Sequence, residues 1–421
     1  MLLRFRITNF ASIRDEQELS MVALDDHPGL ATIAVPLSKE RVLPVSGIFG
    51  PNASGKSNLI KAMTFARAAV IESHQRWLPE DPIPRWPFRL DSESKNAPSE
   101  FVFEFVHDQV RFEYGFSLDD TVILEEWLFS WPKGRRLVLF ERTGLDITFG
   151  ASLTGHKAAI VDLVRENSLF LSAAAANNHP QLRSVATWFG RWRRMTPGAE
   201  YPQPSRLVEE QALNLLRYAD IGVIGSTVTD KAPADQGGFL GRGVPGHAHL
   251  GIESAPEARV ELVHKAQTSR GGEPLPWDWE SSGTQTWLHL SRLALTCLQE
   301  GSIFTIDDLG DNLHPLLTAQ LVGLFQDRES NPHGAQLIFT GHDVKLLGRH
   351  AEYRLRRDQV WLTEKNTSGA SRIYPLTEYG RVRDGVDDVE GRYLQGRYGA
   401  VPFFDRSLLA DLTEEPAADG S

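Results

Sequence analysis

One short glycine-rich segment constrains the fold of this chain more than any other feature of its sequence. The segment has the spacing G-x-x-x-x-G-K-S and consists of Gly50, Pro51, Asn52, Ala53, Ser54, Gly55, Lys56 and Ser57. This is the pattern of a phosphate-binding loop, which requires a buried strand before it and a helix after it. The apolar run 45–49 and the helical pattern 58–72 provide both, so the segment predicts an α/β fold.

The residue types in this loop suit a bound triphosphate. Its glycines let the backbone curl so that successive N–H groups face the phosphate oxygens, and the following helix adds the positive end of its dipole. Lys56 would place a positive charge between the β- and γ-phosphates, and the Ser57 hydroxyl would ligate Mg²⁺. We therefore expect residues 50–57, together with Asn58, to bind ATP and Mg²⁺.

Two later strands are expected to end in polar residues at the same edge of the sheet. The apolar run 302–306 is followed by Asp307, which would hold Mg²⁺, and by a second carboxylate, Asp308. The run 336–340 is followed by His342. At that position a histidine is either an ordinary loop residue or a switch that contacts the γ-phosphate and senses hydrolysis, and we favour the switch.

A serine-rich segment, 280–285, stands directly before a helical pattern at 287–298. Taken alone, it predicts a serine N-cap. Between the two polar strand ends, the pattern 314–326 predicts a helix, so that strand, helix and strand form a parallel βαβ unit. From residue 100 to 142, aromatic and polar residues alternate with period two, which predicts antiparallel hairpins. Residues 359–375 predict a late hairpin.

The chain divides into four predicted parts. Residues 1–149 contain the phosphate loop and an antiparallel β lobe, and residues 150–255 form a mainly helical insertion without heptads. Residues 256–410 carry the second half of the site, and residues 411–421 form an acidic, disordered tail. The glycine- and histidine-rich stretch 235–251 is expected to be a flexible loop, in which His247 and His249 lack a third metal ligand.

Composition limits the remaining possibilities. Hydrophobic residues make up 41% of the 421 residues, and no stretch is long and apolar enough to span a membrane. Because the start MLLRFRITNF does not resemble a secretory segment, we expect a cytoplasmic protein. The single cysteine, Cys297, excludes an internal disulfide and is expected to be a buried hydrophobe. The net charge of −11 disfavours a basic surface, although Arg191, Arg193 and Arg194 form a local cluster.

The order of these segments resembles the SMC/RecF-like branch of the ABC ATPases, which have a P-loop NTPase fold with a mixed central sheet. Segment 280–285 resembles the ABC signature, with Thr284 in place of the usual second glycine, and segment 310–315 resembles the D-loop. The closest likeness is to bacterial AAA/ABC-like ATP-binding proteins of phage-defence loci, of the RloC and AbiL type. The segments that carry it are Phe5–Ile13, Glu280–Gln285 and Gly391–Pro402.

The resemblance implies a head-to-tail homodimer or higher homo-oligomer that sandwiches two ATP molecules. Each nucleotide would meet Ser282 and Gly283 of the second chain, and Lys56, Ser57, Asp307, Asp308 and His342 of the first. Asp308 stands where ABC ATPases usually carry the glutamate that polarises the attacking water. Aspartate is one methylene shorter, so either the water shifts or hydrolysis is slow. The family also implies a separate nuclease or TOPRIM-like effector protein.

These patterns lead to one main functional hypothesis and two alternatives. We expect an ATP-hydrolysing sensor or regulatory subunit of an anti-phage complex. The alternatives are a RecF-like repair ATPase that binds DNA directly, and an ATP-binding module with little turnover. The sequence does not define the adenine contacts, for which Asn9 and the segment Arg14–Glu16 are candidates by position alone.

Overall fold

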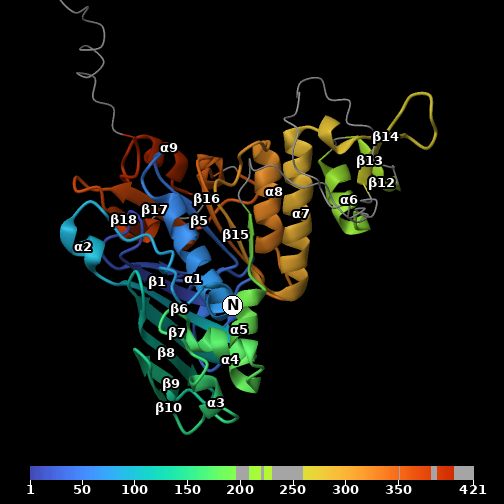
Figure 1. Cartoon of the computed structure of the whole chain (residues 1–421). Coiled ribbons are helices and arrows are strands. Elements are labelled where there is room, and N and C mark those ends of the chain that lie inside the picture. Colours follow the sequence, from blue (N-terminus) through green and yellow to red (C-terminus); the bar gives the residue numbers. More distant parts are fainter. Residues whose placement is uncertain (196–207, 220–221, 230–258, 350, 381–385, 403–421) are drawn as a thin grey trace, which may run out of the picture.

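The structure is a computed structural model that describes residues 1–195, 208–219, 222–229, 259–349, 351–380 and 386–402. Two large sheets with helices packed against them form most of the described chain (Figure 1). The predicted loop 235–251 and the predicted acidic tail 411–421 lie outside the described residues. No described helix combines the length and the apolar character that crossing a bilayer requires.

The first sheet is antiparallel and has seven strands. In spatial order these are β10 (Asp146–Phe149), β9 (Leu137–Thr143), β8 (Ile123–Trp131), β7 (Val110–Leu118), β6 (Ser99–His107), β1 (Leu2–Thr8) and β2 (Gln17–Ser20). The period-two alternation of the sequence places one set of aromatic residues on a single face. This sheet confirms the predicted antiparallel lobe.

The inner face of this sheet is covered by three helices. These are α1 (Lys56–Arg76), α4 (Phe170–Ala176) and α5 (Pro180–Gly190). The rings of Phe105 and Trp188 stack with their centroids 4.1 Å apart, which joins the sheet to α5. Phe101 packs on Phe65 of α1 with centroids 5.2 Å apart. Because aromatic pairs bury large apolar areas, this layer forms one of the two hydrophobic cores.

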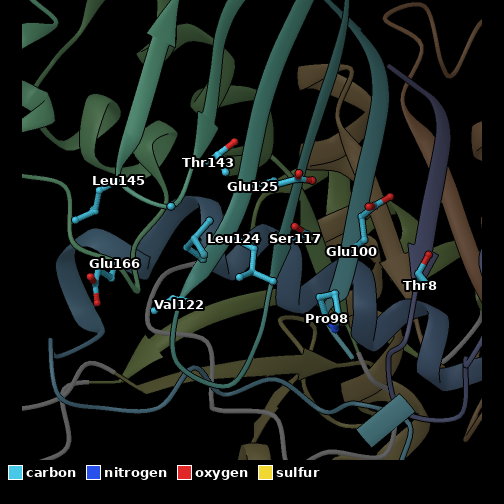
Figure 2. A pocket seen from close by; sticks show the side chains of 12 residues that line it. Thr8, Pro98, Glu100, Ser117, Val122, Leu124, Glu125, Thr143, Leu145 and Glu166 are labelled. Atoms are coloured by element: carbon cyan, nitrogen blue, oxygen red, sulfur yellow. The ribbon is translucent and has the colours of Figure 1, made fainter. Parts of the chain in front are cut away.

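The outer face of the same sheet is polar and hollowed (Figure 2). Strand register places five polar residues side by side across five strands: Thr8, Glu100, Ser117, Glu125 and Thr143. No phosphate-loop residue lines this hollow. The hollow is therefore separate from the candidate nucleotide site.

The second sheet is mixed and has six strands. Their order is β11 (Arg193–Met195), β15 (Ile303–Ile306), β16 (Gln336–Gly341), β5 (Val45–Phe49), β17 (Val360–Lys365) and β18 (Ser371–Pro375). All neighbouring pairs are parallel except β17 and β18, which form the predicted late hairpin. Helix α8 (Pro315–Gln326) connects β15 to β16, as expected for the βαβ unit. The predicted α/β class is confirmed.

Helix α7 (Ser282–Glu300) packs against β15 and β11, and it begins earlier than the helical pattern predicts. The side chain of Ser281 accepts a hydrogen bond from the N–H of Thr284, so the serine N-cap starts the helix at Ser282. Gly301 ends it in the left-handed region with φ 61°. Cys297 is buried in this helix, as predicted, and burial raises the pKa of its thiol to about 11.

The region 150–255 contains helices and strands. Strand β11 belongs to the six-stranded sheet, where it pairs in parallel with β15. Strands β12 (Val223–Thr229), β13 (Arg259–His264) and β14 (Glu273–Leu275) form a separate small sheet beside α6 (Glu210–Tyr218).

The remaining elements are β3 (Ile33–Ala34), β4 (Arg41–Val42), α2 (Ser92–Asn96), α3 (Ala158–Val161), α9 (Val389–Leu394) and the 3-10 helices η1 (Trp277–Trp279), η2 (Val344–Leu347), η3 (Arg357–Gln359) and η4 (Leu376–Tyr379).

Candidate functional site

The predicted phosphate loop connects β5 to α1, as the sequence indicates. A Cβ at Gly50 would collide with the carbonyl oxygen of Thr363, and one at Gly55 would collide with two serine hydroxyls. Gly55 also has φ 106°, a conformation that L side chains rarely adopt. Neither position of the motif has room for a side chain, so both must be glycine. At Gly55 the backbone conformation also favours glycine. Asn52 and Ala53 form the exposed tip of the loop.

Lys56 is held inside the loop. Its Nζ donates hydrogen bonds to the carbonyl oxygens of Gly50 at 2.8 Å and Pro51 at 3.0 Å, and the residue is only 5% exposed. Burial lowers the pKa of Lys56, while the nearby charges of Asp308 and Asp307 oppose that shift. The lysine charge and the two carboxylates thus lie within electrostatic range of one another.

Thr340 fixes the two carboxylate residues at the end of β15. Its Oγ1 donates a hydrogen bond to Oδ1 of Asp307 at 2.8 Å and accepts one from the N–H of Asp308 at 2.8 Å. Asp308 has φ 60°, in the left-handed region that few residues other than glycine adopt and that aspartate tolerates better than most. The threonine on β16 therefore orients the adjacent strand end. The sequence motifs did not identify this role.

His342 follows β16 and faces Asp308. Its Nε2 lies 3.3 Å from Oδ1 of Asp308, and the imidazole is 50% exposed. The contact lies within ion-pair distance but lacks hydrogen-bond geometry, so this carboxylate oxygen has no hydrogen-bond donor among the described residues. This buried oxygen therefore has unused capacity to accept a hydrogen bond.

Two serines from distant parts of the chain support the phosphate loop. Ser371 Oγ, on β18, donates a hydrogen bond to the carbonyl oxygen of Ser54 at 2.6 Å and lies 2.6 Å from Ser12 Oγ. Ser12 Oγ in turn accepts a hydrogen bond from Asn58 Nδ2 at 2.7 Å. The amide of Asn58, a predicted nucleotide contact, is thus used to hold the turn between β1 and β2. Ser12 and Ser371 were not predicted as site residues, because neither lies in the loop motif.

The signature segment lies at the start of α7. Ser282 is the first residue of the helix and is exposed, and Gly283 lies next to the backbone oxygen of Asn312 in the D-loop segment. Within the described part of the chain, no hydrogen bond joins Ser282 or Gly283 to the phosphate loop. The structure therefore brings together Lys56, Asp307, Asp308 and His342, and it leaves the signature outside this group.

The two positional candidates for adenine contacts are engaged elsewhere. Asn9 is 3% exposed; its Nδ2 donates to three backbone carbonyl oxygens, and its Oδ1 accepts from the N–H of Phe88. No atom of its amide remains for a base. Arg14 pairs with the adjacent Asp15 at 3.0 Å.

The residues present fit the expected MgATP. The loop has two glycines that tolerate no side chain and a buried lysine whose hydrogen bonds go to backbone carbonyls. Beside it, after β15, Asp308 has a buried carboxylate oxygen without a donor among the described residues. Ser57 follows the lysine, and its hydroxyl makes no hydrogen bond within the described residues. Hydroxyl and carboxylate oxygens are the ligands that Mg²⁺ prefers, so Ser57 and Asp307 suit the ion.

Comparison with known proteins gives one family match. The profile of a family described as "AAA domain, putative AbiEii toxin, Type IV TA system" matches residues 45–348, well over half of the chain. The matched range begins at β5 and includes the phosphate loop, the signature segment, the two aspartates and His342. The search of curated proteins finds no match to this chain.

Proposed function

The chain belongs to this family of AbiEii-type AAA domains, and from that premise we propose that it is an ATPase that binds MgATP and hydrolyses it to ADP and phosphate. The observation that carries the proposal is the meeting of three segments around Lys56. The loop comes from β5, the carboxylates from β15 and the imidazole from β16, and these three strands are parallel neighbours in the mixed sheet. Ligands bind at such carboxyl edges of parallel strands.

Each residue of the group has a distinct task in this reaction. Lys56 releases its two backbone carbonyls and donates to the phosphates, and the loop N–H groups hold their oxygens. Ser57 and Asp307 hold Mg²⁺, which when bound neutralises phosphate charge. Asp308, whose side chain is 41% exposed, orients and polarises the attacking water. His342, beside Asp308, contacts the γ-phosphate region and responds to its loss.

The short side chain of Asp308 makes slow turnover part of the proposal. Aspartate is one methylene shorter than glutamate, and the left-handed backbone at Asp308 sets the direction from which its carboxylate reaches the site. Slow hydrolysis suits a regulatory switch, in which the bound state must persist long enough to be read by a partner.

We further propose that ATP joins two copies of the chain, each signature segment completing the other copy's site. Ser282 is exposed at the N-terminus of a 19-residue helix, where N–H groups and the helix dipole favour an anion. By the resemblance stated above, the dimer serves as sensor or regulatory subunit of an anti-phage complex whose effector is a separate nuclease or TOPRIM-like protein.

The direct test is phosphate release by the purified protein, compared with Lys56→Ala. The wild type should release phosphate from ATP in a Mg²⁺-dependent reaction, and the variant should lose both binding and release. In cells that carry the neighbouring genes, the same substitution should abolish phage protection, and the neighbour should co-purify with the chain. A wild type that binds ATP without releasing phosphate would favour the alternative of a binding module with little turnover.

Two other roles remain as candidates. A RecF-like repair ATPase would bind DNA directly, which a salt-dependent gel shift would detect. The family description favours a second candidate, the toxin component of a toxin–antitoxin pair. Growth arrest on induced expression of the wild type, relieved by Lys56→Ala, would support that role over defence with a separate effector.

A further inference from the structure

An exposed tryptophan lies beside the signature segment. Trp279 is 75% exposed, the largest exposed fraction of any aromatic side chain among the described residues. It ends η1, two residues before the N-cap Ser281 of α7. Tryptophan is among the residues most enriched at the energetic centres of protein interfaces, so an exposed tryptophan beside the signature segment is a candidate anchor.

The backbone around Trp279 is held from both sides. Before it, Trp277 is buried, and its carbonyl oxygen accepts a hydrogen bond from Gln285 Nε2 at 2.9 Å. After it, the side chain of Glu280 is almost fully buried and pairs with Nε2 of His264, at the end of β13, at 2.8 Å. Trp279 is therefore fixed in an exposed position, so little conformational entropy remains to be lost when a partner covers it.

The same surface carries further exposed polar residues of the signature and D-loop segments. Ser281 and Ser282 are exposed, and Asn312, whose backbone oxygen lies beside Gly283, is exposed as well. No described contact joins these residues to the phosphate loop of their own chain. We infer that Trp279 is the apolar anchor of an ATP-dependent contact with a second copy of this chain, covering the surface beside that copy's phosphate loop; this rests on the dimer proposed above.

The choice of a second copy follows from position. Trp279 lies three residues before Ser282 on a backbone that is held in place. If Ser282 contacts the nucleotide of another protomer, Trp279 therefore lies at the same interface. Tryptophan suits an anchor because it buries about 150–250 Å² and also offers an N–H donor. The His264–Glu280 pair then acts as a positioning contact, since it sets the direction of the loop that carries the indole.

The experiment uses the full chain with Mg²⁺ and a non-hydrolysable ATP analogue, and measures mass by sedimentation velocity. The wild type should dimerise, and Trp279→Ala should weaken dimerisation roughly 30-fold, as expected for a hot-spot tryptophan. Trp86→Ala is the matched control, because Trp86 is also exposed, at 53%, but lies in the loop between α1 and α2. This control should dimerise like the wild type, and Trp279→Phe should recover part of the affinity.

Fluorescence provides a second readout that a general folding defect would not reproduce. The analogue should protect indole fluorescence from iodide quenching in the wild type and in Trp86→Phe, and this protection should be lost in Trp279→Phe. Dimerisation of Trp279→Ala at wild-type strength would overturn the inference and leave the proposed ATPase untouched. A wild type that binds nucleotide but stays monomeric would reject both the contact and the dimer, and a wild type that binds no nucleotide would reject the proposed function itself.

Discussion

The Nε2 atom of His342 lies 3.3 Å from Oδ1 of Asp308, although the two residues belong to different strand ends. The relationship follows from the parallel pairing of β15 and β16, which brings the loops after both strands to one edge of the sheet. Both side chains are partly exposed there, at 50% and 41%. An imidazole and a carboxylate in this position can respond together to the same phosphate group.

Asp308→Asn should separate hydrolysis from binding. The amide keeps the shape of the side chain but is a much weaker base toward a water proton, so phosphate release should fall by about 10²–10⁴-fold. ATP affinity should change little, because Asp307 and Ser57 rather than Asp308 are expected to hold Mg²⁺. The measurements are single-turnover phosphate release and equilibrium binding of a fluorescent ATP analogue.

Asp311→Asn is the matched control for this substitution. Asp311 is an exposed aspartate in the same loop, and within the described part of the chain its side chain makes no hydrogen bond or ion pair with the group around Lys56. Its phosphate release should stay within about twofold of the wild type, since surface substitutions away from buried partners have small effects. Equal losses in both variants would argue against a specific role for Asp308.

Thr340→Val should weaken Mg²⁺-dependent nucleotide binding. Valine has nearly the shape of threonine but removes the hydroxyl that donates to Asp307 and accepts from the N–H of Asp308. Both partners are then left without their buried hydrogen bond, which costs about 1–3 kcal/mol each in such surroundings. Affinity for MgATP should fall more than affinity for ATP without the metal, and Thr340→Ser should restore it. Equal affinities of Thr340→Val with and without Mg²⁺ would contradict this role.

Local patterns predicted the parts of the site that lie within one stretch of chain. The strands Val45–Phe49 and Ser371–Pro375 have the bounds that their apolar residues indicate, and the loop between β5 and α1 follows its motif. Strand β11 was not predicted, because three residues with two arginines show no strand pattern. This strand is stabilised by its parallel pairing with β15. Because the pairing joins distant parts of the chain, the local sequence pattern does not predict it.

The supporting contacts of the site were not predicted for the same reason. Ser12, Thr340 and Ser371 are ordinary polar residues in their own segments. Their importance comes from tertiary hydrogen bonds, such as that between Ser371 and Ser54. A serine that supports a loop from another strand leaves no local signal, whereas glycine and lysine at fixed spacing do.

Ser371→Ala should weaken ATP binding without a large loss of the maximal rate. The hydroxyl donates to the carbonyl of Ser54 and contacts Ser12, so its removal loosens the loop backbone before the nucleotide binds. A hydrogen bond of this kind contributes about 0.5–1.5 kcal/mol, which corresponds to an increase in KM of about 2- to 10-fold. Ser368→Ala, in the turn of the same hairpin, is the control and should leave KM unchanged. A lower kcat with unchanged KM would point to a catalytic role instead.

Glu126→Gln should destabilise the antiparallel lobe. The fully buried carboxylate accepts hydrogen bonds from Tyr114 Oη at 2.9 Å and from the N–H groups of Phe170 at 2.6 Å and Leu171 at 2.9 Å, and it pairs with Arg142 at 3.4 Å. Glutamine replaces one acceptor oxygen with a donor and leaves the guanidinium unpaired. Breaking a buried pair costs about 3–5 kcal/mol, which urea unfolding should register.

Glu113→Gln tests whether any loss of charge on this sheet has the same effect. Glu113 lies on the outer face, where it accepts from Trp127 Nε1 at 3.2 Å and lies 3.6 Å from Arg6, with its side chain 26% exposed. Partly exposed pairs contribute less than about 1 kcal/mol, so the midpoint of unfolding should move little. Similar losses in the two variants would contradict a special role for the buried carboxylate.

Glu100→Gln should stabilise the protein at neutral pH and not at acid pH. Burial raises the pKa of Glu100, the neighbouring carboxylates Glu16 and Glu125 raise it further, and Arg6 opposes them. At pH values above 4.5, the ordinary pKa of this carboxyl group, Glu100 therefore binds protons more strongly in the folded chain than in the unfolded chain. Stability linked to Glu100 is then present at low pH and is lost as pH rises through the raised pKa.

Glutamine does not titrate, so the variant should lack this loss. Its free energy of unfolding in urea should exceed that of the wild type at pH 7, and the difference should shrink toward pH 4, below the ordinary pKa of 4.5. Glu141→Gln, an exposed glutamate on β9, serves as the control and should show no such pH-dependent gain. If Glu100→Gln is less stable than the wild type at pH 7, the carboxylate gains more from its polar neighbours in the hollow than it loses through burial.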